Sequence, residues 1–136
     1  LDAALAAFYA ATVELGVADQ VTTFTASEFG RTLTSNGDGS DHGWGSHHLV
    51  LGGAVRGKAL YGSAPPISLG SSSAAEDQWH VGQGRLLPST SLDQYVATLA
   101  KWFGVAAGEL DSVLPYLRNF GAAGGRPDYP IDLGFV

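Results

Sequence analysis

Two neighbouring stretches of the sequence hold most of the side chains that could bind a metal ion or an anion. Residues 27–32 contain Glu28 and Arg31, and residues 41–48 contain one carboxylate and three of the chain's four histidines. Carboxylate oxygens and imidazole nitrogens are common zinc ligands, and a guanidinium can hold two oxygens of a phosphate or sulfate at once. The pattern therefore predicts a metal or anion site in this part of the chain.

Glu28 and Arg31 follow a stretch that has the character of a buried strand. Residues 20–26 are rich in β-branched side chains and carry no charge. In a sheet of parallel strands, ligands gather at the carboxyl ends of the strands, which is where these two side chains fall. Glu28 is a candidate oxygen ligand or general base, and Arg31 is a candidate clamp for a phosphate or sulfate group. The alternative is that the two side chains form a local ion pair or cap the next element.

Asp41 and His42 are the second candidate pair. A carboxylate beside a neutral imidazole suits zinc or iron better than magnesium, whereas the alternative is a solvated turn in a glycine-rich loop. The sequence has no nucleophile elbow, phosphate loop or HExxH motif, and the catalytic residue is left unassigned. We assign the metal ligands as Glu28, Asp41 and His42, and the anion or substrate contacts as Arg31, His47 and His48. The two adjacent histidines cannot both face one side of a strand.

The elements that must position these side chains begin with a helix and a strand. Apolar residues recur at helical spacing through residues 2–15, and Gly16 follows as a left-handed cap. Helix, turn and strand in this order are half of an α/β crossover unit. Residues 32–46 have few apolar side chains and are expected to run as a surface loop. Further strands are expected at residues 48–51 and 58–61.

The second half of the chain is expected to be a long irregular segment followed by helices. Residues 62–88 contain proline and serine clusters and no clear periodicity. An apolar stripe at helical spacing predicts a helix over residues 92–103, with Trp102 and Phe103 on its core face. A shorter helix is predicted over residues 108–113.

Length and charge limit the classes of function. A chain of 136 residues suits one domain, and 45% hydrophobic residues are enough for a core. The formal net charge of -6 and the lack of a basic cluster argue against nucleic acid as a partner. There is no cysteine, so thiolate metal sites and disulfides are excluded. No apolar run is long enough to span a membrane.

Several motifs in order resemble the C-terminal part of the bacterial DUF1501 family. The resemblance covers nearly the whole chain. It is carried by residues 25–32, by Asn36-Gly37, by residues 41–45, by residues 52–62 with their Gly-Gly pair and Val-Arg-Gly-Lys run, by residues 87–95 and by Trp102-Phe103-Gly104. Members of the family are longer, often carry a twin-arginine export signal, and are placed by similarity in the alkaline phosphatase and sulfatase superfamily.

The resemblance implies an α/β fold, namely a partial α/β/α sandwich with a mostly parallel sheet, as part of a larger domain. Residues 1–120 would be the C-terminal portion of that domain, and residues 121–136 a glycine-rich tail. Because the chain starts with Leu1 and has no methionine, we expect it to begin inside a longer polypeptide. The missing N-terminal part of the same domain would then be its first partner.

The resemblance also implies a function. The chain would belong to an exported hydrolase, periplasmic or at the cell surface, that uses a divalent metal, zinc or else manganese or calcium, to cleave a small phosphate or sulfate ester. His42 matches the placement of a metal-ligating histidine in the superfamily. Glu28 matches a strand-end ligand position, but the next residue there is normally also a ligand, and here it is Phe29. The alternative is a non-catalytic binding or surface-assembly protein that keeps the fold.

Overall fold

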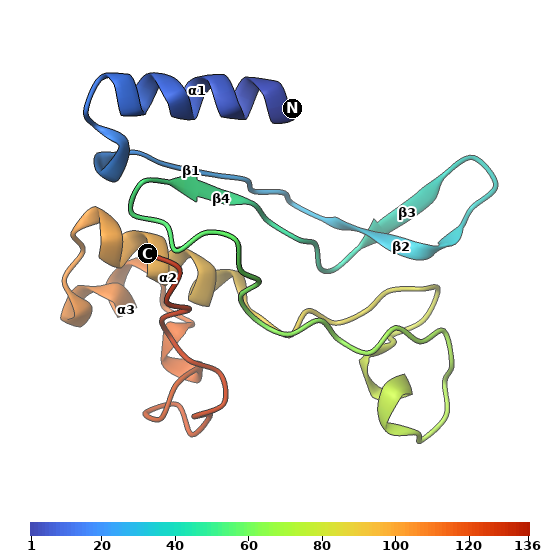
Figure 1. Ribbon diagram of the computed structural model, residues 1–136. Helices are drawn as coiled ribbons and strands as arrows, with labels where there is room; N and C mark the ends of the chain where they lie inside the picture. Colours follow the sequence, from blue (N-terminus) through green and yellow to red (C-terminus); the bar gives the residue numbers. More distant parts are fainter. The chain divides into compact units, whose positions relative to one another are not determined.

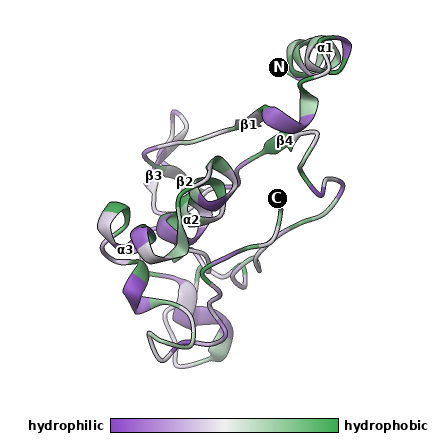
Figure 2. Cartoon of the chain, turned by 90° about the vertical axis from the view of Figure 1, so that its left-hand side faces the viewer, coloured by the Kyte–Doolittle hydropathy of each residue, from purple (hydrophilic) through white to green (hydrophobic).

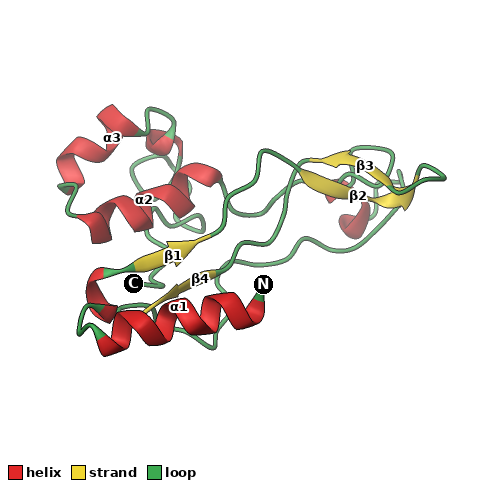
Figure 3. Ribbon diagram, turned by 90° about the horizontal axis from the view of Figure 1, so that it is seen from above, coloured by secondary structure: helices red, strands yellow, loops and turns green.

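The computed structural model describes all residues, 1–136. The chain divides into two compact units, each built from more than one segment of the sequence. The first unit comprises Leu1–Thr25, Leu49–Tyr61 and Leu92–Val136, and the second comprises Ala26–His48 and Gly62–Ser91. Figure 1 labels the helices and strands, and Figure 3 shows them by type.

The chain contains four short β-strands, which form two separate two-stranded sheets. In the first unit, β1 (Thr22–Phe24) pairs antiparallel with β4 (Val50–Gly52), and Thr23 lies opposite Leu51. Gly52 lies so close to β1 that a Cβ at this position would come within 2.6 Å of the Val21 carbonyl oxygen. In the second unit, β2 (Gly30–Ser35) pairs antiparallel with β3 (Ser40–Gly43).

This topology corrects the predicted fold class. The structure has two small antiparallel sheets and three short helices, so the predicted α/β/α sandwich with a mostly parallel sheet is wrong. Parallel strands need a long crossover connection, usually through a helix. Here no helix lies between β1 and β4, because the intervening chain forms β2 and β3 instead. The strand predicted at residues 58–61 is also absent.

The first helix agrees with the sequence prediction. α1 spans Asp2–Glu14, and Gly16 adopts a left-handed φ of +70° just after it, as expected for a helix cap. Only Thr12 is buried on this helix, whereas Phe8 is half exposed and Leu15 is 75% exposed. Apolar residues on α1 appear in green in Figure 2. None of the chain's helices combines the length and apolar character that crossing a membrane requires.

The core of the first unit lies along α2 (Leu92–Phe103), a helix that the sequence predicted with the same bounds. Tyr95 and Leu99 pack with Phe135 in one buried cluster. A second cluster joins Ala97 to two buried leucines, Leu110 and Leu117. Leu110 begins α3 (Leu110–Val113), which falls within the predicted helix at residues 108–113.

Two buried polar side chains of α2 fasten the end of the chain to the core. The Gln94 side-chain amide donates a hydrogen bond to the Pro130 carbonyl at 2.6 Å. The Thr98 hydroxyl accepts a hydrogen bond from the Leu133 backbone N–H at 2.9 Å. Because these partners satisfy buried polar groups, they stabilise the position of residues 130–135.

The predicted core role of Phe103 is wrong. Its side chain is 82% exposed, although Trp102 beside it on α2 is partly buried. The helix ends at Phe103, and Gly104 follows with a φ of +106°. The buried residues of α2 lie earlier in the helix and include polar and small side chains, namely Gln94, Tyr95, Ala97, Thr98 and Leu99. The buried face is therefore rotated away from the face that hydrophobicity alone indicated.

Candidate functional site

The predicted site residues lie on and around a β-hairpin in the second unit. β2 and β3 are joined by residues 36–39, and Asn36 N–H donates to the Gly39 carbonyl at 3.1 Å. Gly37 takes a left-handed φ of +96°, which a glycine adopts without strain. Residues 32–46 lie largely at the surface as predicted, but the prediction of a loop is wrong, because most of them form the two strands of a hairpin. The alternating β-branched residues of β2 and the Asn-Gly pair after it are a hairpin signal.

Three glycines let the backbone close around the base of this hairpin. Gly30 lies opposite Gly43 in the register of the two strands. A Cβ at Gly30 would clash with the Gly45 carbonyl oxygen, and one at Gly43 would come within 2.9 Å of the Arg31 carbonyl carbon. Side chains at these positions would therefore push apart the strands that carry Arg31 and His42.

One face of the hairpin brings three side chains together. Arg31 lies directly opposite His42 in the register, so the two side chains project from the same face. Phe29, two residues before Arg31, stacks its ring on the His42 imidazole with the ring centroids 3.6 Å apart and the planes at 9°. The Arg31 guanidinium carbon lies 5.0 Å from the centroid of the Phe29 ring. We call Phe29, Arg31 and His42 the hairpin triad.

Arg31 keeps most of its hydrogen-bonding capacity on this face. Its Nη1 donates to the Ser40 carbonyl at 2.8 Å, which fixes the side chain along β3. A guanidinium has five N–H donors, so the others can reach an anion. A cation–π contact at an exposed site such as this one contributes about 0.5–1 kcal/mol, which favours this placement without locking it.

Asp41 is next to His42 but is held differently. Successive side chains of a strand point to opposite faces, so Asp41 projects away from the hairpin triad. Its carboxylate accepts a hydrogen bond from the Asn36 side-chain amide at 2.8 Å, and its backbone N–H donates to the Thr32 hydroxyl at 3.1 Å. Asp41 thus stabilises the hairpin itself.

The other predicted site residues lie outside the hairpin strands. Glu28 is exposed in the segment before β2, next to a turn in which the Ser27 hydroxyl donates to the Phe29 carbonyl at 2.8 Å. His47 and His48 follow β3, with His47 exposed and His48 partly exposed. No three histidine or carboxylate side chains converge in a way that could hold a metal ion. The structure therefore brings Arg31 and His42 together and does not bring together the three predicted metal ligands.

The sequence analysis missed two contributors to the hairpin face. Phe29 was considered only as a residue that cannot bind a metal, yet its ring contacts both His42 and Arg31. Arg85 comes from the distant segment 62–91 and donates from its Nε to the His42 carbonyl at 3.3 Å. The aromatic residue two positions before Arg31 was a readable signal, because this spacing places both on one face of a strand. Nothing in the sequence indicated the long-range contact of Arg85.

A second polar cluster organises residues 68–84 of the same unit. The Asp77 carboxylate accepts hydrogen bonds from the Ser68 and Ser72 hydroxyls and from the Ser72 N–H. These hydrogen bonds, first those from the serine hydroxyls, lower the pKa of Asp77 from its ordinary value. The His80 Nε2 accepts from the Gly84 N–H at 2.9 Å, so the ring proton sits on Nδ1, which is 2.6 Å from the Gly70 carbonyl oxygen. These polar groups therefore all have hydrogen-bond partners within residues 68–84.

Comparison with known proteins places the chain in a family but gives no named relative. No curated protein matches the chain, and no solved structure matches it either. Residues 1–100 match the model of the family described as "Protein of unknown function (DUF1501)". This match covers α1, both sheets and most of α2, including all the predicted site residues. The chain belongs to the DUF1501 family.

Proposed function

We propose that the hairpin triad binds the phosphate or sulfate group of a small ester and that the protein is a hydrolase of such esters. The observation that carries the proposal is the pairing of Arg31 with His42 across the hairpin, on the same face and beside one aromatic ring. A guanidinium matches two oxygens of a tetrahedral anion, and an imidazole can add a third hydrogen bond or transfer a proton.

The charge environment supports anion binding at this face. Arg31 forms no ion pair with a carboxylate within 4.0 Å. The alternative of a Glu28–Arg31 ion pair is therefore not adopted. An exposed arginine without an acidic neighbour can bind an external anion without first giving up an internal contact.

The residues of this chain do not form a complete binding site for the metal ion of the proposed hydrolase. Glu28, Asp41 and His42 do not converge, and Asp41 points to the opposite face from His42. His42 keeps its ring edge for other partners, because stacking covers only a ring face. The proposal includes three further points that rest on the order of motifs alone. The protein would be related to alkaline phosphatases and sulfatases, and it would be exported to the periplasm or cell surface. Further parts of the same polypeptide would complete the site.

Binding and turnover can be tested separately. We expect the protein, supplied with zinc, manganese or calcium, to hydrolyse a member of a panel of phosphate and sulfate esters. Arg31→Lys should weaken inhibition by sulfate or vanadate and lower turnover together, because a lysine keeps the charge but loses the planar fork. Arg56→Lys, which makes the same exchange outside the hairpin, is the matched control. Sulfate inhibition that is equal in the wild type and Arg31→Lys would contradict the assignment.

One observation favours a second candidate, a non-catalytic binding protein. Phe29 stacks on His42 at the position where the related hydrolases are expected to have a further ligand. A binding protein needs the anion contact of Arg31 but no complete metal site. In that case Arg31→Lys would weaken anion binding, and no ester would be hydrolysed faster than in buffer with any of the three metals. This outcome would reject the hydrolase and keep the anion-binding hairpin.

A further inference from the structure

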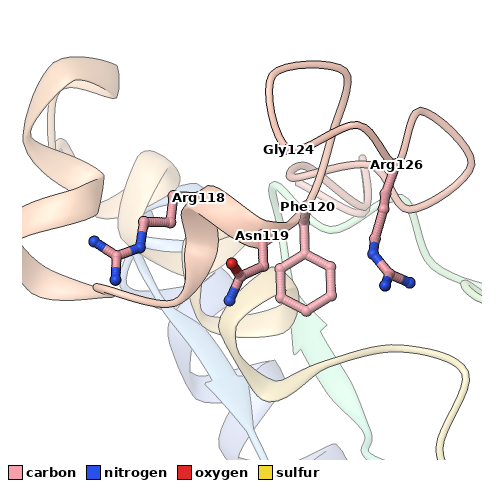
Figure 4. A pocket seen from close by; sticks show the side chains of 5 residues that line it. All are labelled: Arg118, Asn119, Phe120, Gly124 and Arg126. Atoms are coloured by element: carbon pink, nitrogen blue, oxygen red, sulfur yellow. The ribbon is translucent and has the colours of Figure 1, made fainter.

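A pocket of about 530 Å³ lies in the first unit, near the end of the chain. It is lined by Arg118, Asn119, Phe120, Gly124 and Arg126 (Figure 4). Two of these five residues are cationic, and none is acidic. The pocket shares no residue with the hairpin triad, so it calls for its own explanation.

A glycine-rich loop shapes this pocket. Gly121 and Gly125 have left-handed φ angles of +70° and +71°, and a bridge between Gly121 and Arg126 closes the loop. Gly124 packs directly on the backbone of residues 118–120, where a Cβ would come within 2.7 Å of the Arg118 carbonyl oxygen. A side chain at Gly124 would therefore occupy or displace the wall of the pocket. The loop thus has a defined conformation.

The arginines around the pocket have no acidic partners. Neither Arg118 nor Arg126 forms an ion pair with a carboxylate within 4.0 Å, and the Lys101–Asp132 ion pair of the same unit involves neither of them. In a chain with 13 acidic and 7 basic residues, two unneutralised arginines beside one pocket are a local concentration of positive charge. A cleft with one sign of charge attracts ligands of the opposite sign.

The side chains divide the pocket into a polar and an apolar part. Figure 4 shows the Phe120 ring between the Asn119 amide and the Arg126 side chain, with the Arg118 guanidinium directed away from the ring on the other side. Phe120 is partly buried, whereas Asn119 and both arginines are exposed. An anion held by Arg126 would therefore lie beside an aromatic surface, and Arg118 could swing toward the other side of the ring without breaking an ion pair.

We propose that this pocket binds a small organic anion in which a phosphate or sulfate group is attached to an aromatic ring. Arg126 donates hydrogen bonds to the anionic group, whereas Asn119 and Arg118, on the other side of the Phe120 ring, add a polar group and a positive charge there. The ligand's ring packs on Phe120, since offset aromatic contacts add to the burial of apolar surface. This site goes beyond the proposed hydrolase or binding function of the hairpin, because it uses none of its residues.

The experiment titrates the whole protein with phenyl phosphate and follows the backbone amide signals of residues 118–126 by NMR. An Arg31→Gln background removes binding at the hairpin from the measurement, so the two proposals can fail separately. We expect Arg126→Gln to weaken binding about tenfold to a hundredfold, which is the range for one charge-assisted hydrogen bond. Arg118→Gln should have a smaller effect in the same direction. Lys58→Gln, the same charge change outside the pocket, should leave the affinity nearly unchanged.

Two comparisons make the outcome decisive. Inorganic phosphate should bind more weakly than phenyl phosphate, because it has no ring to pack on Phe120. Phenol has no anionic group at neutral pH and should shift no signals. Gly124→Ala should block binding. The Arg31→Gln, Arg118→Gln and Arg126→Gln variants should keep the wild-type spectrum away from the substituted residue, which shows that they are folded. The proposal is overturned if phenyl phosphate shifts no signals of residues 118–126, or if Arg126→Gln and Lys58→Gln bind equally well.

Discussion

The two units of the chain are stabilised by different interactions. The first unit has two buried apolar clusters around α2, centred on Leu99 and Leu117. The second unit has no buried apolar cluster of this kind, and its loop segment is instead held by hydrogen bonds to Asp77 and His80. Its buried positions include Gly30 and Thr32. One unit is thus organised by burial of side chains, and the other by backbone contacts and polar side chains.

This difference matters for where function can arise. An apolar core holds its side chains in fixed positions but offers few polar ones to a ligand. Polar loops expose many polar side chains, which must then be held in place by hydrogen bonds or strand pairing. In the second unit, Arg31 and His42 obtain their positions from strand register, and the loop of residues 68–84 obtains its shape from hydrogen bonds to Asp77 and His80. The proposed anion site of the hairpin therefore depends on the backbone pairing of β2 and β3 rather than on an apolar core.

The largest expected effect comes from breaking the apolar core. Leu117 is 1% exposed and packs against Ala97 and Leu110, so Leu117→Ala should leave a cavity and lower the free energy of unfolding of the first unit by about 2–5 kcal/mol. Hydrogen exchange followed by mass spectrometry should show faster exchange of the α2 amides. The amides of the hairpin should change much less, because the core that supports them is not the same.

Phe103→Ala is the control for this prediction. Phe103 is at the end of the same helix and is 82% exposed, so its removal should change the free energy of unfolding by no more than about 0.5 kcal/mol. The hydrophobic stripe of the sequence had instead predicted a core position for Phe103. If Phe103→Ala destabilised the protein as much as Leu117→Ala, the structural description of α2 would be wrong.

The sequence predicted the helices well because their signals are local. The spacing of apolar residues located α1 and α2, and Gly16 marked the end of α1. Sheet topology depends instead on which distant strands pair, and strand pairing has no local signal in the sequence. The helix and strand of residues 2–24 resembled half of a crossover unit, but the chain after β1 turned into a hairpin and returned antiparallel. The family resemblance added an expectation of a parallel sheet that the topology does not meet.

The candidate site was predictable in part. Residue types identified Arg31 and His42, and the hairpin register brings them face to face. Asp41 could not join them, because adjacent residues on a strand alternate faces, and this was knowable only once residues 40–43 were assigned to a strand. Arg85 reaches the His42 carbonyl from 43 positions along the chain. Such contacts arise from the path of the loop, which composition does not specify.

An intermediate effect is expected from breaking the polar organisation of the second unit. Asp77→Asn keeps the size of the side chain but replaces one acceptor oxygen by an amide donor, so hydrogen bonds from Ser68 or Ser72 are lost. Backbone amides of residues 70–74 should exchange faster, while those of α2 stay protected. Glu76→Gln changes a neighbouring exposed carboxylate and should have no such effect. Equal exchange in Asp77→Asn and the wild type would show that residues 68–80 are held by something other than this carboxylate.

The smallest expected effect concerns the ion pair of the first unit. Lys101 donates to Asp132, and this hydrogen bond, as the main cause, lowers the pKa of Asp132 from its ordinary value of 3.8. Both side chains are about two fifths exposed, at 41% and 39%, so solvent screens the pair. Asp132→Asn keeps an oxygen that can accept from the Gly134 N–H and should lower the free energy of unfolding by no more than about 1 kcal/mol.

The pH dependence of this pair has a definite sign. A carboxyl group whose pKa is lower in the folded than in the unfolded protein binds fewer protons in the folded state, so it stabilises the fold at pH values above its ordinary pKa. That contribution should disappear as the pH falls below 3.8 and through the lower pKa of folded Asp132. Thermal unfolding of the wild type and Asp132→Asn should therefore differ near neutral pH and converge in acid, and added salt should narrow the difference at neutral pH. A difference that grows as the pH falls would mean that Asp132 stabilises the fold through its protonated form, and the ion pair with Lys101 would then have no part in holding residues 130–135 against α2.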